Sequence, residues 1–251
     1  MKRIKKNLPL NKFINHCLYK KKFGYYMKKD SFGKEGDFIT APNVSRLFSE
    51  MITIWILSFW KSLGSPKKFN LIELGAGNGE MMKVIIESSQ NFPIFFKSCK
   101  FIILEKSPSL KKIQKKKLSK TKAIWISNFK NIKKKPTIFL ANEFFDSLEI
   151  KQFIKRKNLW FEKFVHLENN KRAYFFEKEF DMKNFEKKIK FKISKNQNFV
   201  EYSETGVKYL RQTSKIIRKN TGGVLIIDYG YTQNKMKDTL QAISKHKYSN
   251  I

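Results

Sequence analysis

The sequence has few cysteines, few histidines and no long hydrophobic run, and each shortage removes a class of protein. The two cysteines among 251 residues, Cys17 and Cys99, have neither metal-binding nor redox spacing, which points to a reducing compartment. The three histidines are isolated, so we expect no transition-metal site. The longest uncharged apolar run, residues 51–60, is shorter than the roughly 20 residues that a membrane-spanning helix needs, so we expect no membrane span.

Acidic residues are also few, which leaves the chain strongly basic. It carries 53 Lys and Arg against 21 Asp and Glu, a formal net charge of +32, and such a charge first suggests a nucleic-acid partner. Only six of the 53 are arginine, however, and the lysines are spread along the whole chain. Because base readout and bidentate phosphate capture favour arginine, we interpret the charge as compositional drift and do not expect nucleic acid as the partner.

Apolar runs alternate with helical patterns over much of the chain. Strands are predicted at 70–74, 101–105, 123–126, 138–142 and 224–228. Helices are predicted within 8–30, at 43–62, after the first and second of these strands, and at about 205–219. This alternation predicts an α/β fold in which helices cover the faces of a parallel sheet.

The alternation breaks at residues 150–200. Apolar and polar residues there alternate with a period of two around a polar turn at 168–172, which predicts an antiparallel hairpin. We expect the lysine-rich tract 183–198 that follows to be a solvated connection.

Three glycines alternate directly after the first strand of the sheet. Gly75, Gly77 and Gly79 follow Glu73, and glycine lets a ligand approach the main chain closely. The helix that starts there supplies unpaired N–H groups. A dinucleotide turn has the spacing Gly-x-Gly-x-x-Gly, whereas strict alternation next to an acid favours S-adenosylmethionine, whose amino-acid end carries an ammonium group. A dinucleotide, and close helix packing without any ligand, remain the alternatives.

Polar residues follow the second and third strands. Glu105 is placed to accept both ribose hydroxyls of such a cofactor, and Ser127 and Asn128 lie where an adenine amino group would be recognised. The alternative is that Glu105 is an ordinary acid at a helix start, since Ser107 and a proline follow at once.

The fourth strand supplies the other half of a site. Asn142, Glu143 and Asp146 lie within five residues at the carboxyl edge of the sheet, where ligands bind in open α/β folds. Two carboxylates that flank Phe144 and Phe145 can orient a cationic acceptor, because they accept guanidinium N–H bonds while a ring covers its face. The alternative is a pair of exposed acids stabilised by a helix dipole.

Five motifs stand in a fixed order along the chain: GYYM at 24–27, FGKEGDFITAP at 32–42, ELGAGNG at 73–79, ANEFFDSLEIKQF at 141–153, and IDYGY at 227–231 followed by DTLQA at 238–242. Together they resemble the MidA family of S-adenosylmethionine-dependent methyltransferases, which includes the mitochondrial assembly factor of respiratory complex I. The resemblance runs from about residue 8 to the last residue.

The resemblance implies a Rossmann-like class I methyltransferase fold, a mostly parallel sheet flanked by helices, with S-adenosyl-L-methionine as the cofactor. It implies an N-terminal helical extension at 1–66 and a methyltransferase domain at 67–251 with an insertion at about 150–200. The extension is expected to cover the cofactor through residues of the first two motifs. These are Gly24, Tyr25, Tyr26, Gly36, Asp37, Phe38, Ile39 and Thr40.

The implied activity is methylation of an arginine in a partner protein, a respiratory complex I subunit in mitochondria, with Glu143, Asp146 and Asn142 as catalytic residues. A non-catalytic assembly chaperone that binds the cofactor, and an RNA methyltransferase, are the alternatives. Family members continue beyond residue 251, so we expect the last strands of the fold to be missing. Residues 8–18 match the family's first helix, which leaves no room for a presequence and favours a bacterial cytoplasm over a mitochondrial matrix.

Overall fold

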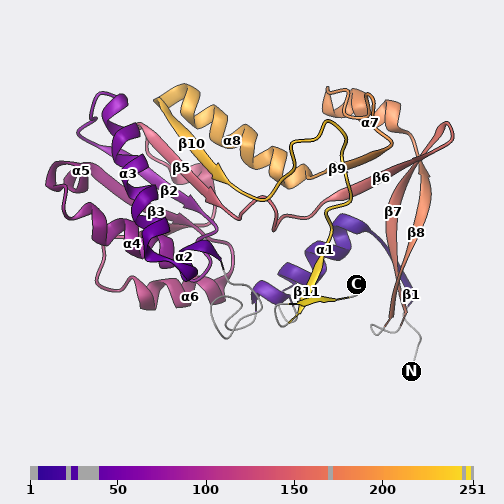
Figure 1. Cartoon of the computed structure of the whole chain (residues 1–251), viewed down its shortest axis with the longest axis horizontal. Coiled ribbons are helices and arrows are strands. Elements are labelled where there is room, and N and C mark those ends of the chain that lie inside the picture. Colours follow the sequence, from indigo (N-terminus) through magenta and orange to yellow (C-terminus); the bar gives the residue numbers. More distant parts are fainter. Residues whose placement is uncertain (1–4, 21–23, 28–39, 169–171, 245–246, 250–251) are drawn as a thin grey trace. The chain divides into compact units, whose positions relative to one another are not determined.

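The structure is a computed structural model that describes residues 5–20, 24–27, 40–168, 172–244 and 247–249 (Figure 1). Its contacts divide the chain into two compact units. We call residues 21–147 and 208–229 the parallel-sheet unit, and residues 1–20, 148–207 and 230–251 the antiparallel-sheet unit. The contacts do not test the functional boundary expected near residue 66.

Five parallel strands in the order β10-β5-β2-β3-β4 form the sheet of the parallel-sheet unit. The strands are β2 (Phe69–Leu74), β3 (Cys99–Leu104), β4 (Ile124–Ile126), β5 (Thr137–Asn142) and β10 (Gly222–Ile227). From β2 the chain adds strands on one side and then on the other, so the strand order reverses between β2 and β5. In open α/β sheets, ligands bind at the carboxyl ends of the strands at such a reversal. The predicted α/β fold with a parallel sheet is confirmed.

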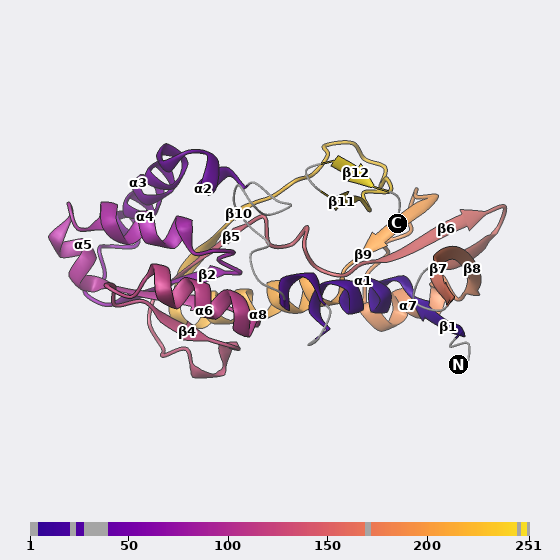
Figure 2. The same cartoon turned by 90° about the horizontal axis from the view of Figure 1, so that it is seen from below.

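Helices cover both faces of this sheet, as Figure 2 shows with α3 and α4 on one side and α8 on the other. The helical elements of this unit are the 3-10 turn η1 (Tyr25–Met27), α2 (Ala41–Val44), α3 (Arg46–Ser62), α4 (Glu80–Ser89), α5 (Pro93–Ser98), α6 (Pro108–Lys117), the 3-10 turn η2 (Phe129–Asn131) and α8 (Glu204–Asn220). None of the helices in the described ranges is long and apolar enough to cross a membrane.

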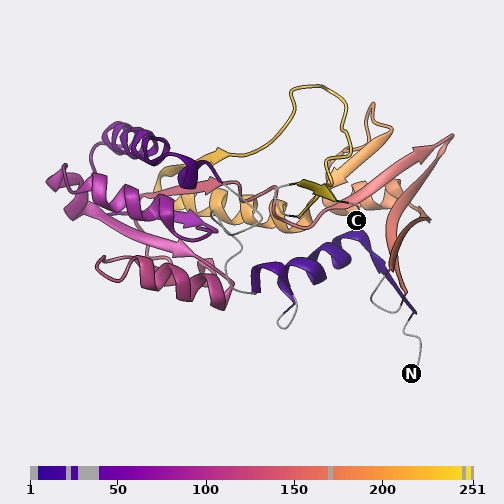
Figure 3. The same ribbon diagram turned by 60° about the horizontal axis from the view of Figure 1, so that its bottom comes forward.

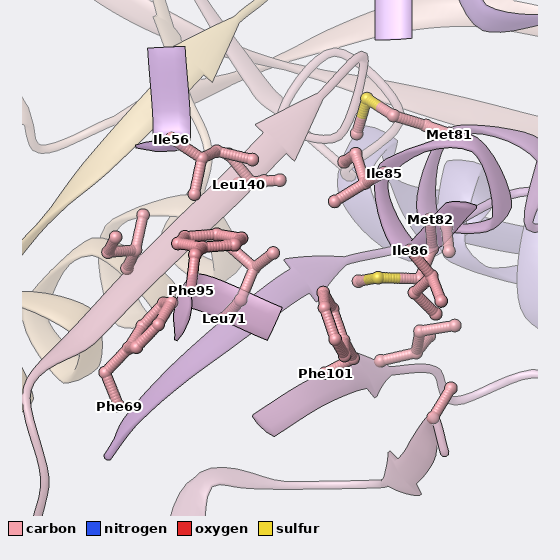
Figure 4. Packing of buried hydrophobic residues seen from close by; sticks show 14 of the residues in the cluster. Ile56, Phe69, Leu71, Met81, Met82, Ile85, Ile86, Phe95, Phe101 and Leu140 are labelled. Atoms are coloured by element: carbon pink, nitrogen blue, oxygen red, sulfur yellow. The ribbon is translucent and has the colours of Figure 1, made fainter. Parts of the chain in front are cut away.

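The main core lies between the sheet and the helices α3, α4 and α5 (Figure 4). Ile56 of α3, Ile85 of α4 and Leu71 of β2 are each 0% exposed, and Leu140 of β5 is 1% exposed. Complete burial of one such side chain stabilises the fold by about 1.5–3 kcal/mol. Glu73 lies two residues after Leu71 on the same strand, and therefore on the same covered face of the sheet.

The antiparallel-sheet unit is built around the long strand β7 (pink and orange strands in Figure 3). β7 pairs with β8 along one edge, and with β6 and then β1 along the other. Its elements are β1 (Lys5–Pro9), α1 (Leu10–Tyr19), β6 (Lys151–Arg156), β7 (Leu159–Glu168), β8 (Arg172–Phe180), α7 (Met182–Ile189), β9 (Phe199–Tyr202), β11 (Ala242–Ser244) and β12 (Lys247–Ser249). The predicted antiparallel pairing around residues 168–172 is confirmed, although residues 169–171 lie outside the described ranges.

Two expectations about local structure are wrong. Residues 182–189 form the helix α7, whose Met182 and Phe185 pack against Phe153 of β6 in a second hydrophobic cluster. Met182, Phe185 and Ile189 have the spacing of one helix face, but the prediction followed the lysine-rich composition of the tract and not this short period. The strand predicted as buried at 224–228 is the sheet edge β10, where Ile226 is 42% exposed. It has one neighbouring strand, so only part of its surface is covered.

Candidate active site

The glycine turn connects β2 to α4. Gly75, Gly77 and Gly79 have φ angles of +64°, +51° and +83°, in the left-handed region that side chains rarely adopt. The Gly79 N–H donates to the Ala76 carbonyl at 2.7 Å, which closes the turn tightly. A Cβ on Gly75 would lie 2.7 Å from the ring of Phe144, so close packing is a second reason for glycine at that position.

Glu73 lies at the end of β2 and is 3% exposed. Among the described residues, its Oε2 atom has no hydrogen-bond partner. Burial, and then the negative charge of Glu105, raises the pKa of Glu73 to about 8. Because a buried carboxyl oxygen without a partner destabilises the fold, a bound cation or donor would relieve this position.

Glu105 follows β3 directly and is 6% exposed. Its Oε1 accepts a bond from the Ser107 N–H at 2.8 Å, and its Oε2 accepts one from the Gln114 Nε2 at 3.0 Å. Burial raises the pKa of Glu105 in spite of these bonds. Each carboxylate oxygen has two lone pairs, and the bonds from Ser107, Gln114 and the Lys106 N–H leave the carboxylate with capacity for a hydroxyl donor. The bond from Ser107 is also what an acid at the start of α6 would make, so both interpretations of Glu105 remain open.

Ser127 and Asn128 follow β4, and the Glu105 N–H donates to the Ile126 carbonyl at 3.1 Å, which brings the two strand ends together. Both residues are exposed. The Ser127 hydroxyl accepts a hydrogen bond from Nζ of Lys111 at 3.2 Å. The Asn128 side chain accepts one from the Lys130 N–H at 2.9 Å and thereby caps η2. Their proposed contact with adenine stays a prediction.

Three acids come together at the carboxyl ends of β5 and β10. The Glu143 N–H donates to the Ile227 carbonyl at 2.8 Å, with Glu143 in the left-handed region at φ +45°. Oδ2 of Asp228 accepts the N–H groups of Phe145 and Asp146 at 2.9 and 3.3 Å. Asp228 therefore holds the short loop that carries the other two acids.

The negative charge of Asp228 contributes to a raised pKa of both Glu143 and Asp146. Burial, followed by the charge of Asp228, raises the pKa of Glu143. Asp146 is exposed as a residue, but atoms crowd its carboxyl group, and this burial together with the charges of Asp228 and Glu143 raises its pKa to about 6. Among the described residues, no Lys, Arg or His forms an ion pair with Glu143, Asp146 or Asp228. The cluster is therefore suited to a cation.

Asn142, the third predicted catalytic residue, precedes this loop as the last residue of β5. Its side chain forms a hydrogen bond with Glu143 that lowers the pKa of that carboxyl group. The buried Oδ1 of Asn142 has no partner among the described residues, so an acceptor remains available beside the acids.

The segment around α2 reaches both the acids and the glycine turn. The Ala41 N–H donates to Oε1 of Glu143 at 3.4 Å. The Asn78 side chain of the turn donates to Oδ1 of Asn43 at 2.8 Å, and Asn43 donates to the Thr40 hydroxyl at 2.8 Å. Thr40 thus lies close to the acids and the glycine turn, and its role in covering the cofactor stays a prediction.

The other part of the covering segment contacts the start of α6. The Ser107 hydroxyl donates to the Tyr26 carbonyl at 2.6 Å, which brings residues 24–27, with Gly24 and Tyr25, beside Glu105. The remaining predicted residues, Gly36, Asp37, Phe38 and Ile39, lie outside the described residues.

Two residues of the site were missed by the sequence analysis. Asp228 stood at the end of a predicted strand and inside a quoted motif, so the rule that placed Asn142 and Glu143 would have found it. Gln114 is buried at the centre of α6 and contacts the glycine turn, Glu105 and β4. The signal for Gln114 was a single uncharged polar residue among lysines, which indicates the inward face of a helix.

Comparison with known proteins finds relatives of this chain. The human protein arginine methyltransferase NDUFAF7, mitochondrial, is 26% identical to this chain, and the match covers 100% of this chain and 62% of the human one. The Drosophila melanogaster homolog is 32% identical, and the match covers 57% of this chain and 38% of the homolog. This chain therefore spans less than two thirds of these relatives. A crystal structure from Burkholderia thailandensis with bound S-adenosyl-homocysteine has a TM-score of 0.68 at 18% identity, covering 84% of this chain and 55% of that one.

The family model of S-adenosyl-L-methionine-dependent methyltransferases, Methyltransf_28, matches residues 51–251. The predictions of the family and of its cofactor are thereby confirmed. The chain belongs to this family, the one also called MidA.

Proposed function

We propose that this protein is an S-adenosyl-L-methionine-dependent methyltransferase that acts on an arginine side chain of a partner protein. The cofactor is that of the family, and the name protein arginine methyltransferase belongs to the curated relatives. The observation that carries the proposal is the group of three acids, Glu143, Asp146 and Asp228, without a cation among the described residues.

The described residues fit the cofactor. The unpartnered Oε2 of Glu73 can accept a bond from its ammonium group, and Glu105 has lone pairs for its ribose hydroxyls. The glycine turn presents backbone without side chains to its amino-acid end. When bound, S-adenosylmethionine supplies a methyl group on a positively charged sulfur. A cation next to Glu73 favours the ionised carboxylate, so binding should lower the raised pKa of Glu73.

The acids would orient the acceptor. Carboxylates accept pairs of guanidinium N–H bonds, so Glu143 and Asp146 can fix one nitrogen in line for attack, while Oδ1 of Asn142 can accept a further N–H. Glu143, with its raised pKa, can receive the proton that this nitrogen loses. Asp228 acts through its two backbone bonds, which hold the loop. Most of the rate enhancement would come from orientation and from the removal of water.

Methylation of RNA is the second candidate, since a net charge of +32 would attract a polyanion. A cofactor-binding chaperone without catalysis is the third possibility. The complex I subunit as substrate, the bacterial cytoplasm or mitochondrial matrix as compartment, and the division into a covering extension at 1–66 and a catalytic domain at 67–251 are parts of the proposal that rest on the resemblance.

Transfer of tritium from labelled cofactor tests the proposal. The purified chain is incubated with a cell lysate and S-adenosyl-L-[methyl-³H]methionine, and the product is digested with protease or with nuclease. We expect protease-sensitive label that migrates as methylarginine after acid hydrolysis. Nuclease-sensitive label would favour RNA, and cofactor binding without any transfer would favour the chaperone.

A further inference from the structure

Gln114 lies on the inward face of α6, a helix whose other side is rich in lysine. It is 0% exposed. A buried amide destabilises the fold unless its polar atoms are paired, and those of Gln114 make three hydrogen bonds. Nε2 donates to the Gly77 carbonyl at 2.8 Å and to Oε2 of Glu105 at 3.0 Å, and Oε1 accepts the indole N–H of Trp125 at 2.9 Å.

These bonds leave one orientation of the amide. An indole N–H can only donate, while a carbonyl and a carboxylate accept. The oxygen of Gln114 must therefore face Trp125, and its nitrogen must face Gly77 and Glu105. One side chain thus connects the glycine turn after β2, the acid after β3 and the strand β4, which are the three segments proposed to hold the cofactor.

The backbone around Gln114 is also close to the turn. A Cβ on Gly79 would lie 3.3 Å from Cγ of Gln114 and 3.6 Å from its Cα, so the glycine allows α6 to approach. The bond from Gln114 lowers the pKa of Glu105, whereas burial raises it. Loss of Gln114 would therefore make Glu105 less available as a charged acceptor as well as free to rotate.

We propose that Gln114 is a positioning residue that fixes the Glu105 carboxylate and the Gly77 carbonyl so that the site selects a nucleoside with free ribose hydroxyls. The inference rests on the proposed cofactor site and adds to it the residue that sets its geometry. Gln114 acts through Glu105 and need not touch the ligand. If Gln114 served only to pack α6, its replacement would weaken the binding of all ligands equally.

The test compares two ligands on the full 251-residue chain by calorimetry: S-adenosyl-homocysteine and its 2′,3′-dideoxy analogue. For the wild type we expect the analogue to bind about 10- to 100-fold more weakly, because it lacks donors to a charged acceptor. For Gln114→Leu, which keeps the volume and removes the bonds, we expect this ratio to fall to within about threefold of unity. The four affinities, of two proteins for two ligands, form a double-mutant cycle in which the ligand carries one of the two changes. This cycle isolates the coupling free energy between Gln114 and the ribose hydroxyls.

Two further variants make the result interpretable. Trp125→Phe leaves Gln114 in place and replaces the indole, with the N–H that fixes the orientation of the amide, by a smaller aromatic ring, so it should lower the ratio part of the way. It serves as the test where Gln114→Leu does not fold. Thr213→Val removes a different buried hydroxyl bond, on α8, and should keep the wild-type ratio.

The outcomes separate the two claims. If Gln114→Leu or Trp125→Phe folds, binds both ligands more weakly and keeps the wild-type ratio, Gln114 is a packing residue and the inference is wrong while the cofactor site stands. A wild-type chain that binds neither ligand overturns the cofactor site and the role of Gln114 together.

Discussion

Several acids of the antiparallel-sheet unit form ion pairs, whereas the acids at the carboxyl edge of the parallel sheet form none among the described residues. These pairs are Lys151 with Glu162, Lys163 with Asp238, Arg156 with Glu177 and Lys192 with Glu186. The bidentate contact with Arg156 lowers the pKa of Glu177. Burial alone would raise the pKa of Asp238, but bonds from Lys163 and Gln152 bring it below its usual value.

The edge of the parallel sheet shows the reverse. Glu73, Glu105, Glu143 and Asp146 all have a raised pKa, with burial as the largest cause. No ion pair of the described residues includes any of the four, in a chain with 53 basic residues. Acids that are paired contribute to stability, and acids that are crowded together without a cation lower it. This difference supports the proposal that the acids of the second group bind a ligand.

The largest effect is expected from Glu143→Gln. The change keeps shape and hydrogen bonding but removes the charge that would orient a guanidinium, so turnover should fall by about 100- to 1000-fold. Affinity for S-adenosyl-homocysteine should stay near the wild-type value. Turnover is measured by scintillation counting of label transferred to a partner protein, and affinity is measured by calorimetry. Glu179→Gln, an exposed acid of the antiparallel-sheet unit, is the control; a Glu143 variant that retains most of its turnover removes the proposed role.

Glu105→Ala should weaken cofactor binding by about 10- to 150-fold, the equivalent of roughly 1.5–3 kcal/mol for bonds to a charged group. NAD should not bind to either protein. Glu162→Gln provides the comparison, since that acid is equally buried but is paired with Lys151, and its loss should leave affinity unchanged. Unaltered affinity in Glu105→Ala, or calorimetric binding of NAD, would contradict the assignment of the site.

Glu73→Gln should change stability in a way that depends on pH. The folded-state pKa of about 8 lies above the usual value, so the folded protein binds the extra proton and wild-type stability falls as pH rises from about 4.5 to 8. The variant has no such titration and should be the more stable protein at pH 8, with a thermal midpoint raised by about 2–4 °C per kcal/mol, and should approach the wild type near pH 5. If the stability of the two proteins depends on pH in the same way, the pKa of Glu73 is not raised in the folded protein and the prediction is wrong.

Asp238→Asn should have the smallest effect. The Lys163–Asp238 pair lies at the surface, with the Asp238 side chain 50% exposed, and such pairs contribute less than about 1 kcal/mol. Because the pKa of Asp238 is lowered, this contribution is present above the usual pKa and lost as pH falls through the folded value. Urea unfolding at pH 7 measures it. Any loss of S-adenosyl-homocysteine affinity in this variant would contradict the assignment of the paired acids to stability and of the unpaired acids to ligand binding.

Much of the site was predictable because its parts are local. Gly75, Gly77 and Gly79 directly follow a strand and precede a helix, and this local pattern predicted a turn at which a ligand can approach the backbone closely; the structure shows that all three have positive φ angles. Glu105 and Glu143 were found by one rule, that residues at the carboxyl ends of parallel strands gather at one edge. The helix α7 was missed although Met182, Phe185 and Ile189 have helical spacing, because the lysine-rich composition of the whole tract outweighed this short period.

The sequence by itself determined the five parallel strands, the glycine turn and the acids Glu73, Glu105, Glu143 and Asp146, because local backbone preferences and side-chain periods depend on neighbouring residues. Only the tertiary structure decided which acids stand alone. Gln114 meets Gly77 across 37 residues of sequence, and Asp228 meets Phe145 across 83. Charge interactions depend on distance and burial, and both are set when the sheet brings distant strand ends together.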